Sequence, residues 1–164
     1  MKKAFTLVEL LIVVAILGIL AAIIVPEYQD HAQLAKEAAA KDNLRILRNA
    51  IELYAAQHNG ISPGYPNGDT GQLPIMIVFI NQLQMATNIN HQFAATGTAG
   101  YNLGPYVKPF PANPFNGKKS VTIATNDALK TPTGMGGWLY DPQTRTIKLD
   151  RLGTDSRGQN FSDY

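Results

Sequence analysis

The chain has no cysteine among its 164 residues. Disulfides, thiol nucleophiles and cysteine-ligated zinc are therefore excluded. Charge is also scarce and nearly balanced, at 14 basic and 12 acidic side chains, with no long basic run. This balance argues against nucleic acid as the main partner. The length leaves room for one globular domain of modest size.

One long apolar run is present, from Phe5 to Val25, just before Pro26. A helix that crosses a bilayer needs about 20 such residues. The run contains a single charge, Glu9, close to its start, and a carboxylate at mid-bilayer costs about 2.5–3.5 kcal/mol. A chain that needed only an anchor would omit this acid. We therefore expect Glu9 to have a partner.

The first residues carry a family resemblance. Lys2-Lys3-Ala4, followed by Phe5-Thr6-Leu7-Val8-Glu9 and the apolar stretch, resembles the class III signal of type IV pilins and type II secretion pseudopilins. The resemblance implies that a prepilin peptidase cuts between Ala4 and Phe5, and that the new N-terminus of Phe5 is methylated. Where the family usually has Gly before the cut, this chain has Ala4.

The resemblance also implies a division of the chain and its placement. Residues 1–4 would be the leader, 5–26 the transmembrane and assembly segment, 27–59 an amphipathic helix that joins the head, and 60–164 the head. Lys2 and Lys3 predict a cytoplasmic N-terminus, because positive charge favours that side of the membrane. The head would then be periplasmic, on a single-pass inner-membrane protein.

Glu9 follows Phe5 by one helical turn, so the two residues share a helix face. We hypothesise that Glu9 pairs with the Phe5 ammonium of an adjacent chain. Such a pair would fix the axial register, because mismatched neighbours would each hold a buried unpaired charge. Two simpler interpretations stay open. One is an ordinary cleaved signal, whose apolar core is shorter, and the other is a plain single-span anchor.

Gly18 and Pro26 are two weak points in this predicted helix, and both fall where the family commonly has them. Proline removes a backbone hydrogen bond and crowds the carbonyl four residues earlier. Pro26 therefore predicts either a fixed kink or, with Gly18, a segment that extends when subunits leave the membrane. The resemblance favours the extending segment.

The next segment, residues 27–59, has the periodicity of an amphipathic helix. Its apolar stripe is formed first by Tyr28, Ala32, Ala35 and Ala39 and then, after a small shift, by Leu44, Leu47, Ile51 and Tyr54. Asn59-Gly60 is typical of a helix end.

The head begins with a polar stretch and a second apolar segment. Ile75, Phe79, Leu83 and Ala86 share one face of a short predicted helix, with Pro74 in its first turn. The β-branched run 75–80 is also compatible with a strand. Residues 87–104 are polar and contain glycine, and we expect a loop there.

Residues 104–117 contain four prolines, which exclude a regular helix. Pro111-x-x-Pro114 matches a polyproline ligand, but the aromatic side chains Tyr106, Phe110 and Phe115 favour a cover over the sheet. The stretch resembles the loop ahead of the sheet in major pseudopilins.

Three short strands are predicted at 121–125, 137–140 and 146–149, the last two joined by a turn at Asp141-Pro142. The simplest architecture is α+β, with a long N-terminal helix packed on a small antiparallel sheet, as in pilins.

The tail begins with Leu152-Gly153-Thr154-Asp155, which resembles the start of the calcium loop of major pseudopilins. The resemblance implies Leu152 (through its carbonyl), Asp155 and Asp163 as ligands of Ca²⁺, which takes six to eight oxygens. The alternative is a solvated tail whose acids point to water.

No catalytic constellation is evident. His31, His58 and His91 lack metal-ligand spacing, and we expect them at the surface or at interfaces. We predict a protein that is not an enzyme. The resemblance implies a subunit that polymerises, with minor pseudopilins, into the periplasmic pseudopilus of type II secretion. An inner-membrane platform with an ATPase would drive assembly.

Two other functions stay open. One is a type IV pilus subunit for adhesion, motility or DNA uptake. The other is a monomeric binding module tethered to the bilayer.

Overall fold

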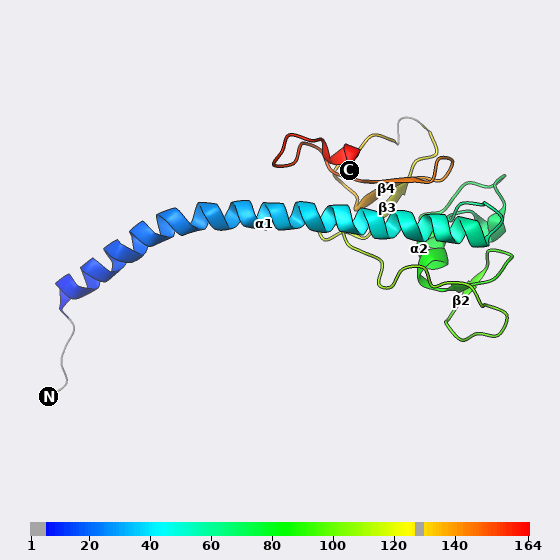
Figure 1. The fold of residues 1–164 in the computed structure, drawn as a ribbon, viewed down its shortest axis with the longest axis horizontal. Helices are drawn as coiled ribbons and strands as arrows, with labels where there is room; N and C mark the ends of the chain where they lie inside the picture. The colour runs from blue at the N-terminus through cyan, green and yellow to red at the C-terminus, as the bar shows by residue number, and fades with distance from the viewer. Residues whose placement is uncertain (1–5, 127–129) are drawn as a thin grey trace. The chain divides into compact units, whose positions relative to one another are not determined.

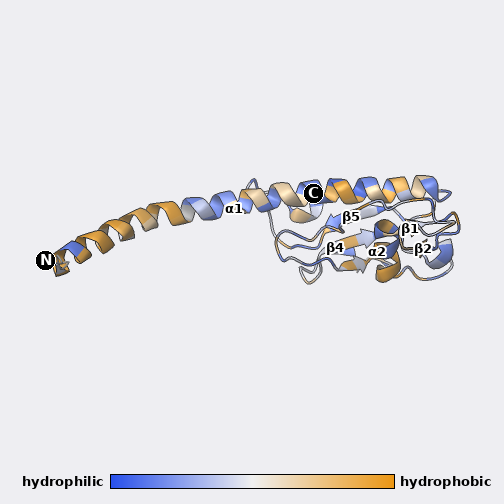
Figure 2. Cartoon of the chain, turned by 90° about the horizontal axis from the view of Figure 1, so that it is seen from below, coloured by the Kyte–Doolittle hydropathy of each residue, from blue (hydrophilic) through white to orange (hydrophobic). Residues whose placement is uncertain are grey.

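The computed structural model describes residues 6–126 and 130–164. The chain divides into two compact units, Met1–Lys36 and Glu37–Tyr164. The helix α1, Leu7–Gln57, contributes to both units. Its front half is almost uniformly apolar, whereas polar and apolar residues alternate in its back half, as Figure 2 shows by colour. The predicted long helix is thus confirmed, with its apolar and amphipathic halves.

The remaining elements belong to the second unit (Figure 1). They are the 3-10 turn η1 (Pro66–Gly68), the helix α2 (Met76–Gln84), the strands β1 (Ala86–Thr87), β2 (Phe93–Ala94), β3 (Val121–Ile123), β4 (Trp138–Asp141) and β5 (Thr146–Leu149), and the 3-10 turn η3 (Phe161–Asp163). β1 and β2 form a two-stranded sheet, and a second sheet has the order β3-β4-β5. The α+β architecture is therefore as predicted.

The β4–β5 hairpin forms as predicted. Trp138 lies opposite Leu149 and Tyr140 opposite Ile147, so all four side chains share the buried face. The turn is held by Asp141, whose Oδ1 accepts a hydrogen bond from the backbone N–H of Gln143 at 2.9 Å.

The sheet is mixed, whereas the sequence predicted a wholly antiparallel one. β3 pairs in parallel with β4, in the register Val121 to Trp138. A parallel pair needs a connection that returns the chain to the end of the sheet from which it started. This connection lies between Ile123 and Trp138. No local sequence pattern predicts that the two strands it joins run parallel.

The back half of α1 supplies one wall of the core. Leu44, Leu47, Ile51 and Tyr54 are fully buried, as the predicted stripe requires. Toward the N-terminus the buried face continues through Ala40 and Glu37 rather than through Ala39, which is exposed. The spacing from Glu37 to Tyr54 is a regular alternation of three and four residues, the pattern of one helix face.

Aromatic residues fill the space between α1, α2 and the sheet. Phe79 of α2 stacks near Tyr140 with ring centroids 4.3 Å apart, and meets Phe110 edge to face at 6.2 Å. The indole N–H of Trp138 donates to the carbonyl of Pro111 at 3.1 Å. Each such buried side chain contributes about 1.5–3 kcal/mol. Residues 104–117 therefore cover the core, as predicted.

The segment after α1 differs from the sequence prediction in its details. α2 is a helix, which decides between the two interpretations of residues 75–80, and its Phe79 and Leu83 are buried. The helix ends at Gln84, and Ala86 begins β1 instead of extending the helix face. The predicted loop 87–104 contains β2, which pairs antiparallel with β1. Strands of two residues carry too short a pattern to be recognised from the sequence.

A buried carboxylate organises the loop that precedes β4. Asp150 Oδ1 accepts from the backbone N–H of Thr133 (2.5 Å) and Gly134 (2.8 Å), and Oδ2 accepts from that of Gly136 at 2.6 Å. A Cβ on Gly136 would lie 2.8 Å from Asp150 Oδ2, and one on Gly137 would collide with the carbonyl oxygen of Lys118. Glycine is therefore required at both positions, because a side chain would collide with the Asp150 carboxylate at one and with the backbone of Lys118 at the other.

Candidate functional site

The front half of α1 exposes its large apolar side chains on all sides. Between Leu7 and Val25 these side chains are about half exposed or more, and Leu7 itself is 79% exposed. In the described part of the chain, α1 is the one helix whose length and composition would allow it to cross a membrane. Such a surface in water would be an association site. The segment therefore requires lipid or other apolar helices around it.

Glu9 caps the start of this helix. The backbone N–H and the hydroxyl of Thr6 both donate to Glu9 Oε2, at 2.9 and 2.8 Å, and the N–H of Glu9 lies 3.2 Å from the Thr6 hydroxyl. This is a capping box, which satisfies backbone donors that a helix start leaves free. The sequence signal is Thr6-x-x-Glu9, which the sequence interpretation overlooked.

The capping box leaves part of the carboxylate available. Both donors bind Oε2, and within the described residues Oε1 has no hydrogen bond. Glu9 can therefore cap its own helix and still accept a donor from outside the chain. Ala4 and Phe5 lie outside the described residues, so cleavage and methylation there stay predictions.

Gly18 and Pro26 both fall inside α1, which is helical from Leu7 to Gln57. A Cβ added at Gly18 would meet open space, so packing within the chain does not require glycine there. The extension of this segment during assembly stays a prediction.

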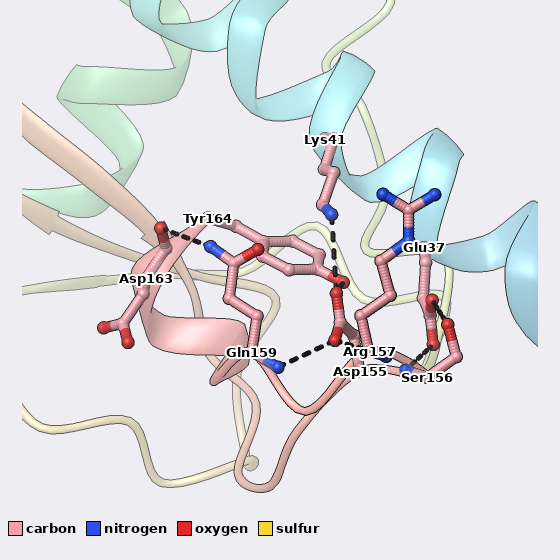
Figure 3. Close-up of polar contacts among 8 residues, drawn as sticks. All are labelled: Glu37, Lys41, Asp155, Ser156, Arg157, Gln159, Asp163 and Tyr164. Carbon is pink, nitrogen blue, oxygen red and sulfur yellow. Dashed lines mark hydrogen bonds and ion pairs between the residues drawn. The ribbon is translucent and has the colours of Figure 1, made fainter.

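The tail folds into a loop around a buried acid (Figure 3). Asp155 Oδ1 accepts from the backbone N–H groups of Arg157 and Gln159, both at 2.9 Å. Its Oδ2 accepts from the Tyr164 hydroxyl at 2.8 Å and from Lys41 Nζ at 3.4 Å. Burial opposes ionisation, but these donors outweigh it and lower the pKa of Asp155 to about 2.

A second acid of α1 binds the neighbouring residue of the loop. Glu37 is buried, and its Oε1 accepts from the backbone N–H of Ser156 at 3.0 Å while Oε2 accepts from the Ser156 hydroxyl at 2.7 Å. Glu37 and Lys41 are one helical turn apart. Together they hold the adjacent residues Asp155 and Ser156 against the helix (Figure 3).

Of the three residues implied as calcium ligands, Asp155 is buried and Asp163 and Leu152 are exposed. Asp163 is exposed, its carboxylate accepts from the Asn160 amide (3.2 Å) and the Ser162 hydroxyl (3.3 Å), and it points away from Asp155 in Figure 3. Leu152 is 63% exposed. Among the described residues, no group of three or more acidic, histidine or cysteine side chains could hold a metal ion. Calcium binding stays a prediction of the resemblance, and this donor set does not fit it.

Two of the three histidines lie in the interior, contrary to the sequence expectation. His58 and His91 are both buried, whereas His31 is exposed and lies 3.9 Å from Glu27. His58 stacks on Tyr54 with ring centroids 3.9 Å apart, and the Tyr54 hydroxyl is 3.1 Å from His91 Nδ1. His58 directly follows α1, and its spacing of four residues from Tyr54 continues the buried stripe, which is the signal that could have placed it.

Comparison with known proteins agrees with this arrangement. Residues 1–25 match the family described as the prokaryotic N-terminal methylation motif. The chain is 30% identical over 154 residues to a fimbrial protein of Neisseria meningitidis, covering 86% of this chain and 89% of that protein. It is 28% identical over 114 residues to the type II secretion system core protein G of Aeromonas hydrophila, covering 70% of this chain and 68% of that protein.

Other relatives align over a shorter stretch of the chain, with a higher sequence identity there. A fimbrial protein of Pseudomonas aeruginosa is 49% identical over 51 residues, which is 31% of this chain and 33% of that protein. In such cases the chain aligns with only a third of the relative's length. No solved structure matches the chain.

An apolar N-terminal helix with a methylation motif, continued into an α+β head, defines the class of pilin-like filament subunits. The chain belongs to the type IV pilin-like family, which includes the fimbrial proteins and the type II secretion core protein named above.

Proposed function

We propose that this protein is a structural subunit that polymerises into a periplasmic filament, the pseudopilus that drives type II protein secretion. The observation that carries the proposal is the exposed apolar segment from Leu7 to Val25, whose single acid retains an unbonded oxygen within the described residues. Neither a soluble enzyme nor a simple anchor needs that combination.

Polymerisation would move the apolar segment from lipid into a bundle of like segments. Lipid tails are as apolar as the neighbouring helices, so the transfer gains little from hydrophobicity, and packing with polar contacts supplies specificity. Glu9 would bind the ammonium of Phe5 in an adjacent subunit through Oε1, while Oε2 keeps the cap. A neighbour in the wrong register would leave this carboxylate unpaired in an apolar bundle.

The partners follow from the same proposal. A prepilin peptidase would remove residues 1–4 and methylate Phe5, and minor pseudopilins would join the filament. An inner-membrane platform with an ATPase would extract subunits from the bilayer. Before extraction the chain would span the inner membrane once, with a cytoplasmic N-terminus and a periplasmic head.

A second candidate is a subunit of a type IV pilus for adhesion, motility or DNA uptake. The long match to the Neisseria fimbrial protein supports it. The absence of cysteine supports the pseudopilus, because many type IV pilins close a C-terminal loop with a disulfide. The resemblance of residues 104–117 to the corresponding loop of major pseudopilins favours the same choice.

One pair of variants separates the two roles of Glu9. Glu9→Gln keeps a capping side chain, since glutamine also serves in a capping box, but removes the charge. Thr6→Ala removes the side-chain contact and keeps the charge. We expect Glu9→Gln to abolish the filaments that are pelleted by centrifugation after the outer membrane is opened, whereas Thr6→Ala still assembles. Filaments at the normal level in Glu9→Gln would contradict the pairing role.

The processing and the choice of system have separate tests. Mass spectrometry of the membrane-extracted protein should find an N-terminus at methylated Phe5, and recovery of the chain with Met1 attached would contradict processing.

In cells from which the gene is deleted, proteins that are normally secreted should accumulate in the periplasm. Loss of surface pili with normal secretion would instead favour the pilus subunit.

A further inference from the structure

The Asp155 carboxylate is almost completely enclosed, with 1% of its side chain exposed. Each of its oxygens already receives two donors: two backbone N–H groups on Oδ1, and the Tyr164 hydroxyl and the Lys41 ammonium on Oδ2. A metal ion needs oxygen lone pairs that are free. Binding one here would require displacing Lys41 or another of these donors.

Lys41 occupies the position that a bound cation would take. Its Nζ lies 3.4 Å from Asp155 Oδ2 and 4.1 Å from the centroid of the Tyr164 ring. The ammonium therefore interacts with a carboxylate and with the face of an aromatic ring at once, and cation–π contacts of this kind are attractive. Tyr164 closes the arrangement, because its hydroxyl binds the same carboxylate oxygen.

The loop is attached to α1 by one ion pair and by one acid that accepts two hydrogen bonds from a serine. Lys41 holds Asp155, and Glu37, one turn earlier, holds Ser156 through both its backbone and its hydroxyl. Glu37 therefore meets a neutral donor and Lys41 meets the acid, and a shift of the loop that moved Asp155 to Glu37 would place two carboxylates together. The contact therefore specifies the position of the loop as well as holding it (Figure 3).

We propose that Lys41 is the resident cation of the C-terminal loop, which closes on α1 through Lys41, Asp155 and Tyr164 without a metal ion. The loop then needs neither calcium nor a disulfide to stay folded. The proposal concerns the folded head, and it holds for either kind of filament.

The test uses the full chain in detergent micelles under two conditions. One contains millimolar calcium, and the other contains EGTA and no added calcium. Hydrogen exchange of the Arg157 and Gln159 amides and the melting temperature are measured. For the native chain we expect both to be the same in calcium and in EGTA. Lys41→Met should accelerate exchange of these two amides about tenfold. Lys36→Met, the same change at an exposed lysine of α1, should leave them unchanged.

Two results would overturn the proposal. One is slower tail exchange or a higher melting temperature of the native chain in calcium than in EGTA. The other is exchange in Lys41→Met that equals that of the native chain. The comparison of calcium with EGTA needs no variant, so it decides the question even if Lys41→Met does not fold. Because no readout involves filaments, failure here is distinguishable from failure of the proposed polymerisation.

Discussion

His58, at the end of α1, and His91, after β1, face each other in the interior with ring centroids 4.9 Å apart. His58 Nδ1 lies 2.9 Å from the Tyr54 carbonyl oxygen, and Nε2 lies 3.0 Å from that of Asn88. His91 Nδ1 meets the Tyr54 hydroxyl at 3.1 Å. The two rings thereby join the β1–β2 segment to the helix.

His91 makes folding stability sensitive to mild acid. Burial, and then the neighbouring His58, lower the pKa of His91. An unfolded chain takes up a proton at this residue near pH 6.5, whereas the folded chain does so only at lower pH. Below about pH 6.5 the unfolded state therefore binds more protons than the folded state, and the stability decreases as the pH is lowered. Melting temperatures measured from about pH 7 down to about pH 5 should decrease by a few degrees.

A matched pair of variants assigns this effect. His91 has a positive φ of 63°, so His91→Asn is the appropriate replacement, because asparagine tolerates that conformation. The pH dependence should weaken in His91→Asn and persist in His31→Gln, which alters an exposed histidine. An unchanged pH dependence in His91→Asn would assign the effect to other groups.

Asp150→Asn should destabilise the head. Asparagine has one acceptor oxygen, whereas Asp150 accepts from the N–H groups of Thr133, Gly134 and Gly136 through both oxygens. At least one buried donor would lose its partner, at a cost of about 1–3 kcal/mol. Urea unfolding followed by Trp138 fluorescence measures the change. Asp163→Asn, at an exposed position, is the control, and an equal loss in both variants would argue against the role of Asp150.

The core contribution of α1 can be measured on two faces of the same helix. Leu47 is fully buried, whereas Leu53 is 50% exposed. Leu47→Ala should cost about 2–5 kcal/mol through lost burial and a residual cavity, and Leu53→Ala should have little effect on the free energy of unfolding. Equal effects would mean that the assigned packing face is wrong.

Gly18→Ala tests the role of backbone freedom in the apolar segment. Alanine fits without a clash and should stabilise the helix by about 0.5–1 kcal/mol. If assembly extends this segment, as we propose, a stiffer helix should lower the filament yield while the melting temperature of the head stays constant. Filament yield equal to that of the native chain would count against extension.

Features encoded in local periodicity were accessible from the sequence. The long helix, the buried Leu44 and Leu47 stripe and the β4–β5 hairpin all follow from spacing within a few residues. The Thr6–Glu9 cap was equally local, but the Thr6-x-x-Glu9 spacing was overlooked.

Features that depend on distant contacts were not accessible. The parallel pairing of β3 and β4 depends on how the chain returns around Asp150. The approach of His58 to His91 depends on how the segment that contains β1 and β2 contacts the chain next to the end of α1. In the tail, the resemblance identified Asp155 as important, but its partner Lys41 lies on α1, far away in sequence.

The return of the tail to α1 also constrains when the head can mature. Arg48 of α1 donates to the carbonyl oxygens of both Ile147 and Tyr164, and Phe161 is part of the core. The back half of α1, which is synthesised first, thus finds its packing partners only when residues far later in the chain have been made. Until then the unfinished head exposes Leu44, Leu47 and Ile51, which makes the partly synthesised chain prone to association.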